Sequence, residues 1–335
     1  MTGDTPFPWR RALVTGGAGF LGSHLCERLL DSGVQVDCAD NLVCGRRRNV
    51  CHLEDRPGFR FVECDVCAAD CAAQLPGPYD LVLHFAGPAS PADCLRMPLE
   101  SLDAGSLGTR NALGIAERDG ARFLLASACA AYGGPQAHPR HEGSRGHVNP
   151  VRPRSVYDES KRFGEALVTA HAGTRGTDAG IVRPSHTYGP RMRAHDGSAV
   201  PTFIAQALAG EPVTVTGDGS RTRSLCYVDD TVDGILRVAA SRSARLVTIG
   251  GSAEITVADL ARLVVALTGS RSPIAFVDRP VDDPGRRRPH ATLARELLGW
   301  SPQIPWEEGL KQTIAYFSAR PWAPVPTEED PAPQS

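Results

Sequence analysis

The stretch VTGGAGFLGSHL, residues 14–25, decides the fold of this chain. A short apolar run begins at Arg11 and ends at Thr15, directly before Gly16 and Gly17. A short apolar run that ends in glycines is typical of a buried parallel strand. Apolar residues then recur at helical spacing from Leu21 to Leu30, and Gly33 follows as a stop signal. The stretch therefore predicts a strand, a tight glycine loop and a helix in direct succession.

The same alternation continues along the first half of the chain. Further strand-like runs lie at 34–39, 59–64, 81–85, 123–126 and 180–183, with helical stretches between them at about 100–118 and 155–172. Alternating strands and helices form a parallel sheet with helices on both faces. We therefore expect an α/β fold with a Rossmann-type doubly wound parallel sheet, formed mainly by residues 11–185.

The second half of the chain lacks the regular alternation of strands and helices. It is rich in loops from Arg191 to Gly219, and its helical patterns lie at 200–209, 228–239, 257–267 and 306–317. We expect residues 186–318 to form mainly a smaller α/β lobe over the carboxyl edge of the sheet, where open α/β sheets bind ligands, with some segments returning to the larger domain. The tail at 319–335 is rich in Pro and Glu, which predicts disorder.

Composition narrows the class of protein. The 335 residues carry a formal net charge of −2, with 41% hydrophobic and 22% charged residues, so nothing favours nucleic acid or membrane binding. The sequence has no signal-like start and no apolar run long enough to span a bilayer, which favours the cytoplasm. Of the 10 cysteines, Cys64, Cys67 and Cys71 cluster without a second matching pair. We therefore expect ordinary thiols in a reducing compartment and no metal site.

The glycine loop is typical of a dinucleotide site. Glycines permit the tight turn and a close backbone approach to a pyrophosphate, and the helix N-terminus offers free N–H groups to its charge. The residues that we expect to contact the cofactor here are Gly16, Gly19, Phe20, Leu21 and Gly22.

Asp40, at the end of the second predicted strand, indicates which dinucleotide binds. A carboxylate there accepts hydrogen bonds from the adenosine ribose hydroxyls and repels a 2′-phosphate. Arg46, Arg47 and Arg48 leave NADP as an alternative cofactor, but the carboxylate favours NAD.

Tyr157 and Lys161 lie one turn apart on a predicted helix, so both project from one face. A nearby ammonium lowers the pKa of a phenol and lets the tyrosinate act as a base toward a substrate hydroxyl. A single Y-x-x-x-K pattern is weak, but together with the glycine loop it indicates a dehydrogenase-type active site.

With these motifs the sequence resembles the extended short-chain dehydrogenase/reductase family of nucleotide-sugar enzymes. The resemblance is greatest to the branch that decarboxylates UDP-glucuronate to UDP-xylose. The segments that carry it are VTGGAGFLGSHL (14–25), DNLVCGRRRNV (40–50), HFAGPASP (84–91), GHVNPVRPRSVYDESKR (146–162), GPRM (189–192), GEPVTVTGDGSRTRSLCYVDD (210–230) and DDPGRRRPH (282–290).

The resemblance implies NAD as cofactor, a UDP-sugar substrate and a homodimer that pairs through the helix of the Tyr-Lys dyad. It implies that Tyr157 is the base, Lys161 its partner, and Arg287 a neighbour of the sugar carboxylate. The other residues it implies are Asp40, Asn41, Arg46, Asp65, Val66 and Ala86 for the cofactor, and Pro88, Ser90, His186, Arg191, Arg223 and Arg287 for the substrate.

The sequence departs from the family pattern inside the active site. Ala128 and Ala130 stand where the family usually has a hydroxyl and a carboxylate, Gly105 replaces an Asn, and His186 replaces another Asn. The missing carboxylate disfavours dehydration, which needs an acid and a base. Decarboxylation needs less, because once C4 is a ketone the C5 carboxylate is a β-keto acid and leaves without a base.

Three functions therefore stay open, with decarboxylation of UDP-glucuronate first. The second is a UDP-sugar 4-epimerase or a variant that releases the 4-keto sugar, since both need only Tyr157, NAD and space for the keto sugar. The third, from another class, is a catalytically impaired protein that binds nucleotide sugars, which the two alanines would explain.

Overall fold

The computed structural model describes residues 7–132, 142, 148–152, 155–194, 196–278 and 291–319. Its larger lobe contains one parallel sheet whose strands run in the order β11-β6-β5-β4-β1-β2-β3. The strands are β1 (Arg11–Thr15), β2 (Gln35–Asp40), β3 (Phe59–Glu63), β4 (Leu81–His84), β5 (Arg122–Ala126), β6 (Ala179–Pro184) and β11 (Leu246–Ile249). The order reverses at β1, which confirms the predicted doubly wound fold.

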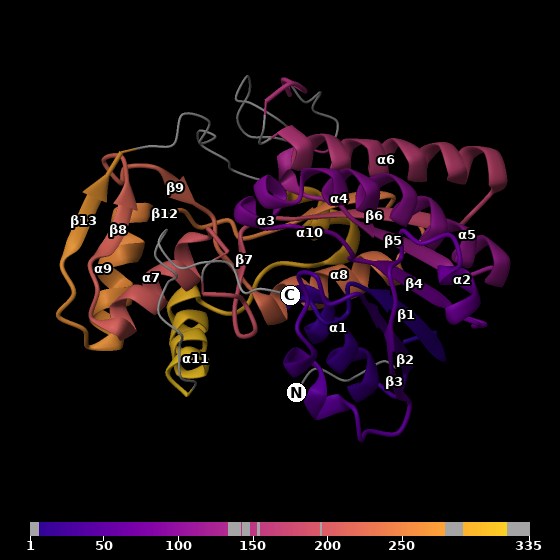
Figure 1. Cartoon of the computed structure of the whole chain (residues 1–335), viewed down its shortest axis with the longest axis horizontal. Helices are drawn as coiled ribbons and strands as arrows, with labels where there is room; N and C mark the ends of the chain where they lie inside the picture. The colour runs from indigo at the N-terminus through magenta and orange to yellow at the C-terminus, as the bar shows by residue number, and fades with distance from the viewer. Residues whose placement is uncertain are drawn as a thin grey trace, which may run out of the picture.

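Helices cover both faces of this sheet (Figure 1). One face carries α1 (Phe20–Asp31), α8 (Val228–Ala240) and α10 (Thr292–Leu298). The other carries α2 (Cys71–Gln74), α4 (Pro98–Asp103), the π-helical segment η3 (Ala104–Gly108), α5 (Thr109–Asp119) and α6 (Ser155–Arg175). The remaining short elements of this lobe are α3 (Pro91–Arg96), η1 (Arg47–Asn49), η2 (Cys51–Leu53) and η4 (Cys129–Tyr132).

The strands are apolar on both sides because each face has its own core. Val14 and Leu83 belong to one cluster of buried side chains, whereas their neighbours Leu13 and Val82 belong to the other. Successive side chains of a strand point to opposite faces, so an almost continuous apolar run is what a doubly covered strand requires. The first cluster continues into the smaller lobe, so the two lobes share a core.

The smaller lobe lies beside the carboxyl edge of the sheet, drawn in orange and yellow in Figure 1. Its elements are α7 (Ala199–Ala209), α9 (Val257–Thr268), α11 (Trp306–Ser318), β8 (Val213–Thr216), β9 (Thr222–Arg223), β12 (Ile255–Thr256) and β13 (Ile274–Val277). The two-residue strands β7 (Thr187–Tyr188) and β10 (Cys226–Tyr227) pair in parallel.

The two halves of the chain are interleaved in space. Helix α8 and strand β11 come after residue 186 and yet belong to the larger lobe, as the expected return of later segments allows. The division at 185 itself stays a prediction, and the expected disordered tail lies, apart from Ala319, outside the described residues. No helix in the described ranges combines the length and apolar character needed to cross a membrane.

Candidate active site

The glycine loop joins β1 to α1 and packs directly against the end of β4. Gly16 has a φ of +70°, and a Cβ there would lie 2.6 Å from the backbone nitrogen of Ala86. A Cβ at Gly22 would lie 2.1 Å from the carbonyl oxygen of Gly16. Both positions therefore require glycine for reasons internal to the protein.

Gly19 differs from these two because it faces open space. It is the N-cap of α1, and among the described residues no side chain caps the helix. A Cβ there would meet only the Gly16 carbonyl oxygen, at 3.0 Å, within the described structure. Phe20 and Leu21 begin the helix, so their first-turn N–H groups lie at this open side. The loop thus fits a dinucleotide pyrophosphate, which would approach at Gly19.

Asp40 ends β2 beside this loop and is buried. Its Oδ2 accepts the N–H of Ala18 at 2.9 Å, and its Oδ1 accepts the N–H of Leu42 at 2.8 Å. Burial raises the pKa of Asp40, while these two N–H groups oppose the rise. A Cβ at Gly45 would lie 2.5 Å from Oδ1, so Gly45 packs directly against the carboxylate and a side chain there would clash with it. The carboxylate is held where ribose hydroxyls could donate to it.

The arginines after β2 have different environments. The Arg46 N–H donates to the Ala18 carbonyl at 3.0 Å, which ties this residue to the glycine loop. Arg47 is turned elsewhere, because its Nε donates to Glu54 at 2.8 Å and its guanidinium lies 4.7 Å from the ring centroid of Phe61. Of these two arginines, Arg46 therefore stays next to the predicted adenosine site, whereas Arg47 is bound to Glu54 and points away from it.

Asn41, predicted at the ribose, and Asp65 and Val66, predicted at the adenine, lie in short turns. Asn41 is exposed and its side chain accepts a backbone N–H, and Asp65 does the same for the N–H of Cys67, at 2.8 Å. The carbonyl of Val66 accepts the side-chain amide of Asn111 from α5, at 2.9 Å. No local sequence pattern points to Asn111, because its partner lies 45 positions away.

His84 ends β4 in the centre of the sheet and was also missed. Its Nδ1 shares a hydrogen bond with Thr15 Oγ1 at 2.7 Å, and its Nε2 shares one with Thr109 Oγ1 at 3.2 Å. Burial, followed by the charge of Lys161, lowers its pKa to about 3. The neutral ring therefore joins the ends of β1 and β4 to α5.

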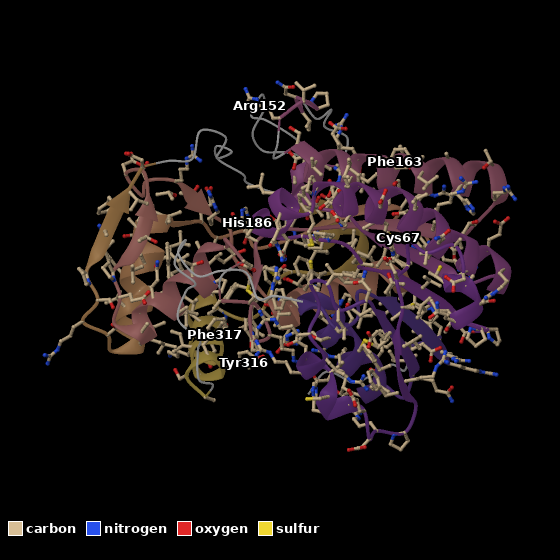
Figure 2. All side chains as sticks on the ribbon, in the orientation of Figure 1. Cys67, Arg152, Phe163, His186, Tyr316 and Phe317 are labelled. Atoms are coloured by element: carbon tan, nitrogen blue, oxygen red, sulfur yellow. The ribbon has the colours of Figure 1, made fainter. Side chains whose placement is uncertain are left out.

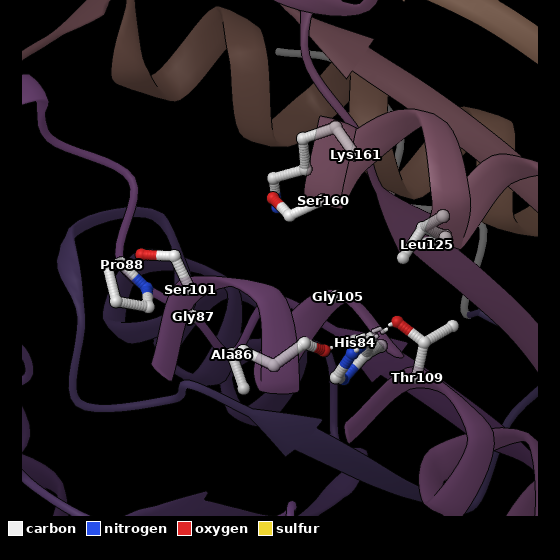
Figure 3. Close-up of a pocket in the computed structure, with 12 residues that line it drawn as sticks. His84, Ala86, Gly87, Pro88, Ser101, Gly105, Thr109, Leu125, Ser160 and Lys161 are labelled. Atoms are coloured by element: carbon white, nitrogen blue, oxygen red, sulfur yellow. Dashed lines mark hydrogen bonds between the residues drawn. The ribbon is translucent and has the colours of Figure 1, made fainter. Parts of the chain in front are cut away.

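A small pocket lies between the end of β4, η3 and α6, and Figure 3 shows the side chains around it. Its volume of about 10 Å³ is the space of one water molecule. Ala86 and Pro88 from the segment after β4 and Lys161 from α6 all line it, so predicted site residues from two distant segments meet here.

Tyr157 and Lys161 both lie on α6, and the Lys161 Nζ is 5.7 Å from the Tyr157 ring centroid. The Nζ also donates to the carbonyl of Ala126, at the end of β5, at 2.9 Å. Burial lowers the pKa of Lys161 to about 8. The structure thus brings the predicted dyad together and fixes the ammonium against the sheet.

The segment after β5 has two alanines at the positions where the family usually has a hydroxyl and a carboxylate. Ala128 and Ala130 are both buried, with 8% and 3% of their surface exposed. The neighbouring Ser127 hydroxyl donates to Glu165 at 2.5 Å, and Glu165 forms an ion pair with Arg183 at 2.6 Å. This hydroxyl is therefore engaged in a structural network.

Arg191 follows β7 and lies against α1. It has a φ of +71°, and its Nη2 donates to Glu27 and lies 3.2 Å from the Nε2 of His52. Its Nη1 is buried without a hydrogen-bond partner among the described residues. The guanidinium is thus partly neutralised by the protein and retains one donor for an anion, and its predicted role at the UDP phosphates stays a prediction.

The other predicted substrate residues are spread over the site. His186 follows β6 with a φ of +43°, a conformation rare for a residue with a side chain, and Figure 2 shows it between the two lobes. Ser90 caps α3, where its hydroxyl accepts the N–H of Asp93 at 3.1 Å. Arg223 lies on β9 in the smaller lobe, and Arg287 lies outside the described residues.

Metal ligation has no visible basis in the described part of the chain. No group of three or more His, Cys, Asp or Glu side chains converges there as metal ligands do. Cys64, Cys67 and Cys71 are free thiols beside β3 and α2, two of them buried.

Sequence and fold both match known proteins. The NAD dependent epimerase/dehydratase family matches residues 12–250. The UDP-glucuronic acid decarboxylase 1 of Danio rerio is 43% identical over 309 residues, which cover 92% of this chain and 73% of that protein.

Two solved structures illustrate the likeness in fold. The dTDP-glucose 4,6-dehydratase of Streptomyces venezuelae, with NAD bound, has a TM-score of 0.84 at 28% identity, covering 92% of this chain and 97% of that chain. The UDP-glucose 4-epimerase of Thermotoga maritima, with UDP-glucose, has a TM-score of 0.83 at 28% identity, covering 92% and 99%. Both lobes therefore have counterparts in these proteins.

Proposed function

The chain belongs to the NAD dependent epimerase/dehydratase family, and from this premise we propose that it is a UDP-glucuronate decarboxylase that forms UDP-xylose and CO2. The observation that carries the proposal is the 43% identity to a UDP-glucuronic acid decarboxylase along 92% of the chain. The site supports it, because Lys161 of the dyad lines a pocket together with Ala86, and Ala86 packs against Gly16 of the loop that fits a dinucleotide.

The cofactor is NAD, which supplies the oxidation of the sugar C4 alcohol and the later reduction of the C4 ketone. Tyr157 takes the proton of the C4 hydroxyl as a general base. The Lys161 ammonium, held by the Ala126 carbonyl, stabilises the tyrosinate. When the ketone is reduced, the same phenol returns the proton to the oxygen.

The decarboxylation step needs little from the two alanines. The 4-keto sugar is a β-keto acid, so its C5–C6 bond breaks and the electron pair passes to the C4 oxygen as CO2 leaves. The protonated Tyr157 can donate a hydrogen bond to that oxygen. Because Ala128 and Ala130 provide no acid or base, we assign the orientation of the carboxylate to Arg287 and the protonation of C5 to a water molecule.

We assign the recognition of UDP to the edge between the lobes. Arg191 keeps a buried Nη1 without a partner among the described residues, and a diphosphate would satisfy it. Arg223 is the second proposed phosphate contact, and His186 the proposed contact near the sugar.

A homodimer is the proposed assembly, through the outer surface of α4, η3 and α6. These elements pack on one another and expose large apolar side chains. Leu99 is 71% exposed, Leu107 48% and Phe163 54%, and Figure 2 labels Phe163 on α6. Apolar surface of this kind is typical of a face that another chain covers.

We also propose a cytoplasmic location. All 10 cysteines lie in the described ranges; none of them forms a disulfide there, and seven are buried. This number of cysteines without a disulfide suits a reducing compartment.

The direct test is release of CO2 from UDP-glucuronate labelled with ¹³C at the carboxyl carbon. The proposal expects labelled CO2 in proportion to the protein added. Labelled carboxylate that stays on the sugar after prolonged incubation would contradict it.

A further inference from the structure

Residues 190–193, which we call the strap, follow β7, precede α7 of the smaller lobe and lie against the larger lobe. At one end the strap is fixed to α1. The His24 Nε2 lies 3.0 Å from the Pro190 carbonyl oxygen, and Arg191 forms an ion pair with Glu27 one turn further along that helix. Burial, followed by the charge of Arg191, lowers the pKa of His24 to about 4, so the ring is neutral and its Nε2–H donates to the carbonyl.

At its other end the strap is fixed to α3. Both Nη atoms of Arg193 donate to the carboxylate of Asp93, and its Nη2 also lies 3.2 Å from Ser90 Oγ. Asp93 is 4% exposed. Burial opposes its ionisation, yet hydrogen bonds from Arg193, Ser90 and Arg96 lower its pKa to about 2. The pair therefore joins the buried carboxylate of Asp93 to the Arg193 guanidinium, whose side chain is 23% exposed, and both groups are charged.

The sheet order shows what the strap crosses. Helix α3 follows β4, the loop that contains Cys44 and Arg46 follows β2, and β1 with its glycine loop lies between these two strands. Cys44 hydrogen-bonds to Asp93, and the charges of Arg193 and Asp93 act on Arg46. Groups from both sides of the glycine loop thus meet at the Asp93–Arg193 pair.

A backbone hydrogen bond also joins the loop after β2 to the glycine loop. The Arg46 N–H donates to the Ala18 carbonyl, so this side of the ring begins at the glycine loop. The strap, α1, α3 and the loop after β2 therefore surround the place where the pyrophosphate fits.

We propose that the strap is a latch, in which the Arg193–Asp93 pair retains NAD and must open before the dinucleotide leaves. The inference rests on the cofactor of the proposed function, in which the dinucleotide is oxidised and reduced within one cycle and has no need to leave. Arg193 and Asp93 act here as positioning residues, since they hold the strap beside the glycine loop. Breaking a charge pair whose carboxylate is buried acts mainly on the rate of opening.

The test measures NAD exchange in the full-length protein. The purified protein is loaded with radiolabelled NAD, and loss of label is followed after addition of excess unlabelled NAD. Arg193→Gln removes the contact from the strap, whereas Arg96→Gln removes a second cation from the same carboxylate without touching the strap. We expect exchange to be about tenfold faster or more in Arg193→Gln, and to change by less than about twofold in Arg96→Gln.

A second variant guards against a folding defect. Asp93→Asn weakens the same contact from the other side, and thermal unfolding of each variant shows which are folded. Equal exchange rates in the wild type and in a folded Arg193→Gln or Asp93→Asn protein would overturn the latch, as would equal acceleration by Arg96→Gln. The readout needs no sugar, so a protein that exchanges NAD as expected but releases no CO2 would sink the proposed activity alone.

Discussion

At the scale of single residues, the chemistry depends on how Lys161 is held. Its Nζ donates to the Ala126 carbonyl at 2.9 Å and lies near the Tyr157 ring. Replacing Tyr157 by Phe removes the proton acceptor and keeps the packing. We expect kcat for CO2 release to fall by about 10²–10⁴, with UDP-glucuronate binding, measured by calorimetry, nearly unchanged. A variant with more than half of the wild-type rate would contradict the assignment.

The pH dependence follows from the same ammonium. Burial lowers the pKa of Lys161 from its ordinary value to about 8, so the group is charged below that pH and neutral above it. We expect kcat/KM to fall as the pH rises through about 8. In Lys161→Arg the cation persists to far higher pH, so the alkaline fall should move upward even though the rate is lower. An unmoved alkaline limb in that variant would assign it to another group.

Residue by residue, the sequence predicted the groups that occur in local patterns. The glycine loop, Asp40 and the Tyr157–Lys161 spacing each lie within one turn or at one strand end. His84 and the Asp93–Arg193 pair could not be predicted, because their partners are distant in the chain, 100 positions for the pair. Only the fold brings such groups together.

At the scale of elements, the π-helical segment η3 sets the distance between α4 and α6. A Cβ at Gly105 would lie 2.6 Å from the Ser160 carbonyl oxygen, one residue before Lys161. The Asn expected from the family pattern would therefore force α6 outward. We expect Gly105→Asn to destabilise the protein by about 1–3 kcal/mol, measured by urea unfolding.

A matched control lies on α6 itself. Gly173 has nothing within 4 Å of a built Cβ in the described structure. Gly173→Ala should therefore leave stability unchanged or raise it by about 0.5–1 kcal/mol. If Gly105→Asn were as stable as the wild type, the packing of η3 on α6 would not be as tight as these distances require.

In the second half of the chain, sequence patterns predicted the helices of three or more turns best. The helices at α7, α8, α9 and α11 agree with the expected ranges within two residues. Strands β8, β13 and β11 were missed, because a four-residue run outside the regular alternation of strands and helices in the first half of the chain is too short to separate a strand from a loop. The position of β11 in the main sheet depends on pairing with β6, a long-range contact.

At the scale of the whole molecule, the exposed apolar surface of α4, η3 and α6 predicts assembly. A variant carrying both Leu99→Glu and Phe163→Glu should change a dimer into a monomer in light scattering, because two charges would be buried in the interface. Phe276→Glu is the matched control, since Phe276 is 55% exposed on β13 in the smaller lobe. A wild-type monomer, or a dimer in the double variant, would contradict this interface.

The product distinguishes a decarboxylase from an epimerase. NMR of the sugar formed from UDP-glucuronate by the NAD-loaded protein identifies it most directly, because one spectrum reports both loss of the carboxylate and the configuration at C4. We predict UDP-xylose, lighter than the substrate by the lost CO2, or its 4-keto precursor if the protein releases the intermediate, lighter by CO2 and two hydrogen atoms because C4 stays oxidised. A product that retains the carboxylate and has the inverted configuration at C4 would show that the protein is an epimerase and would contradict the account.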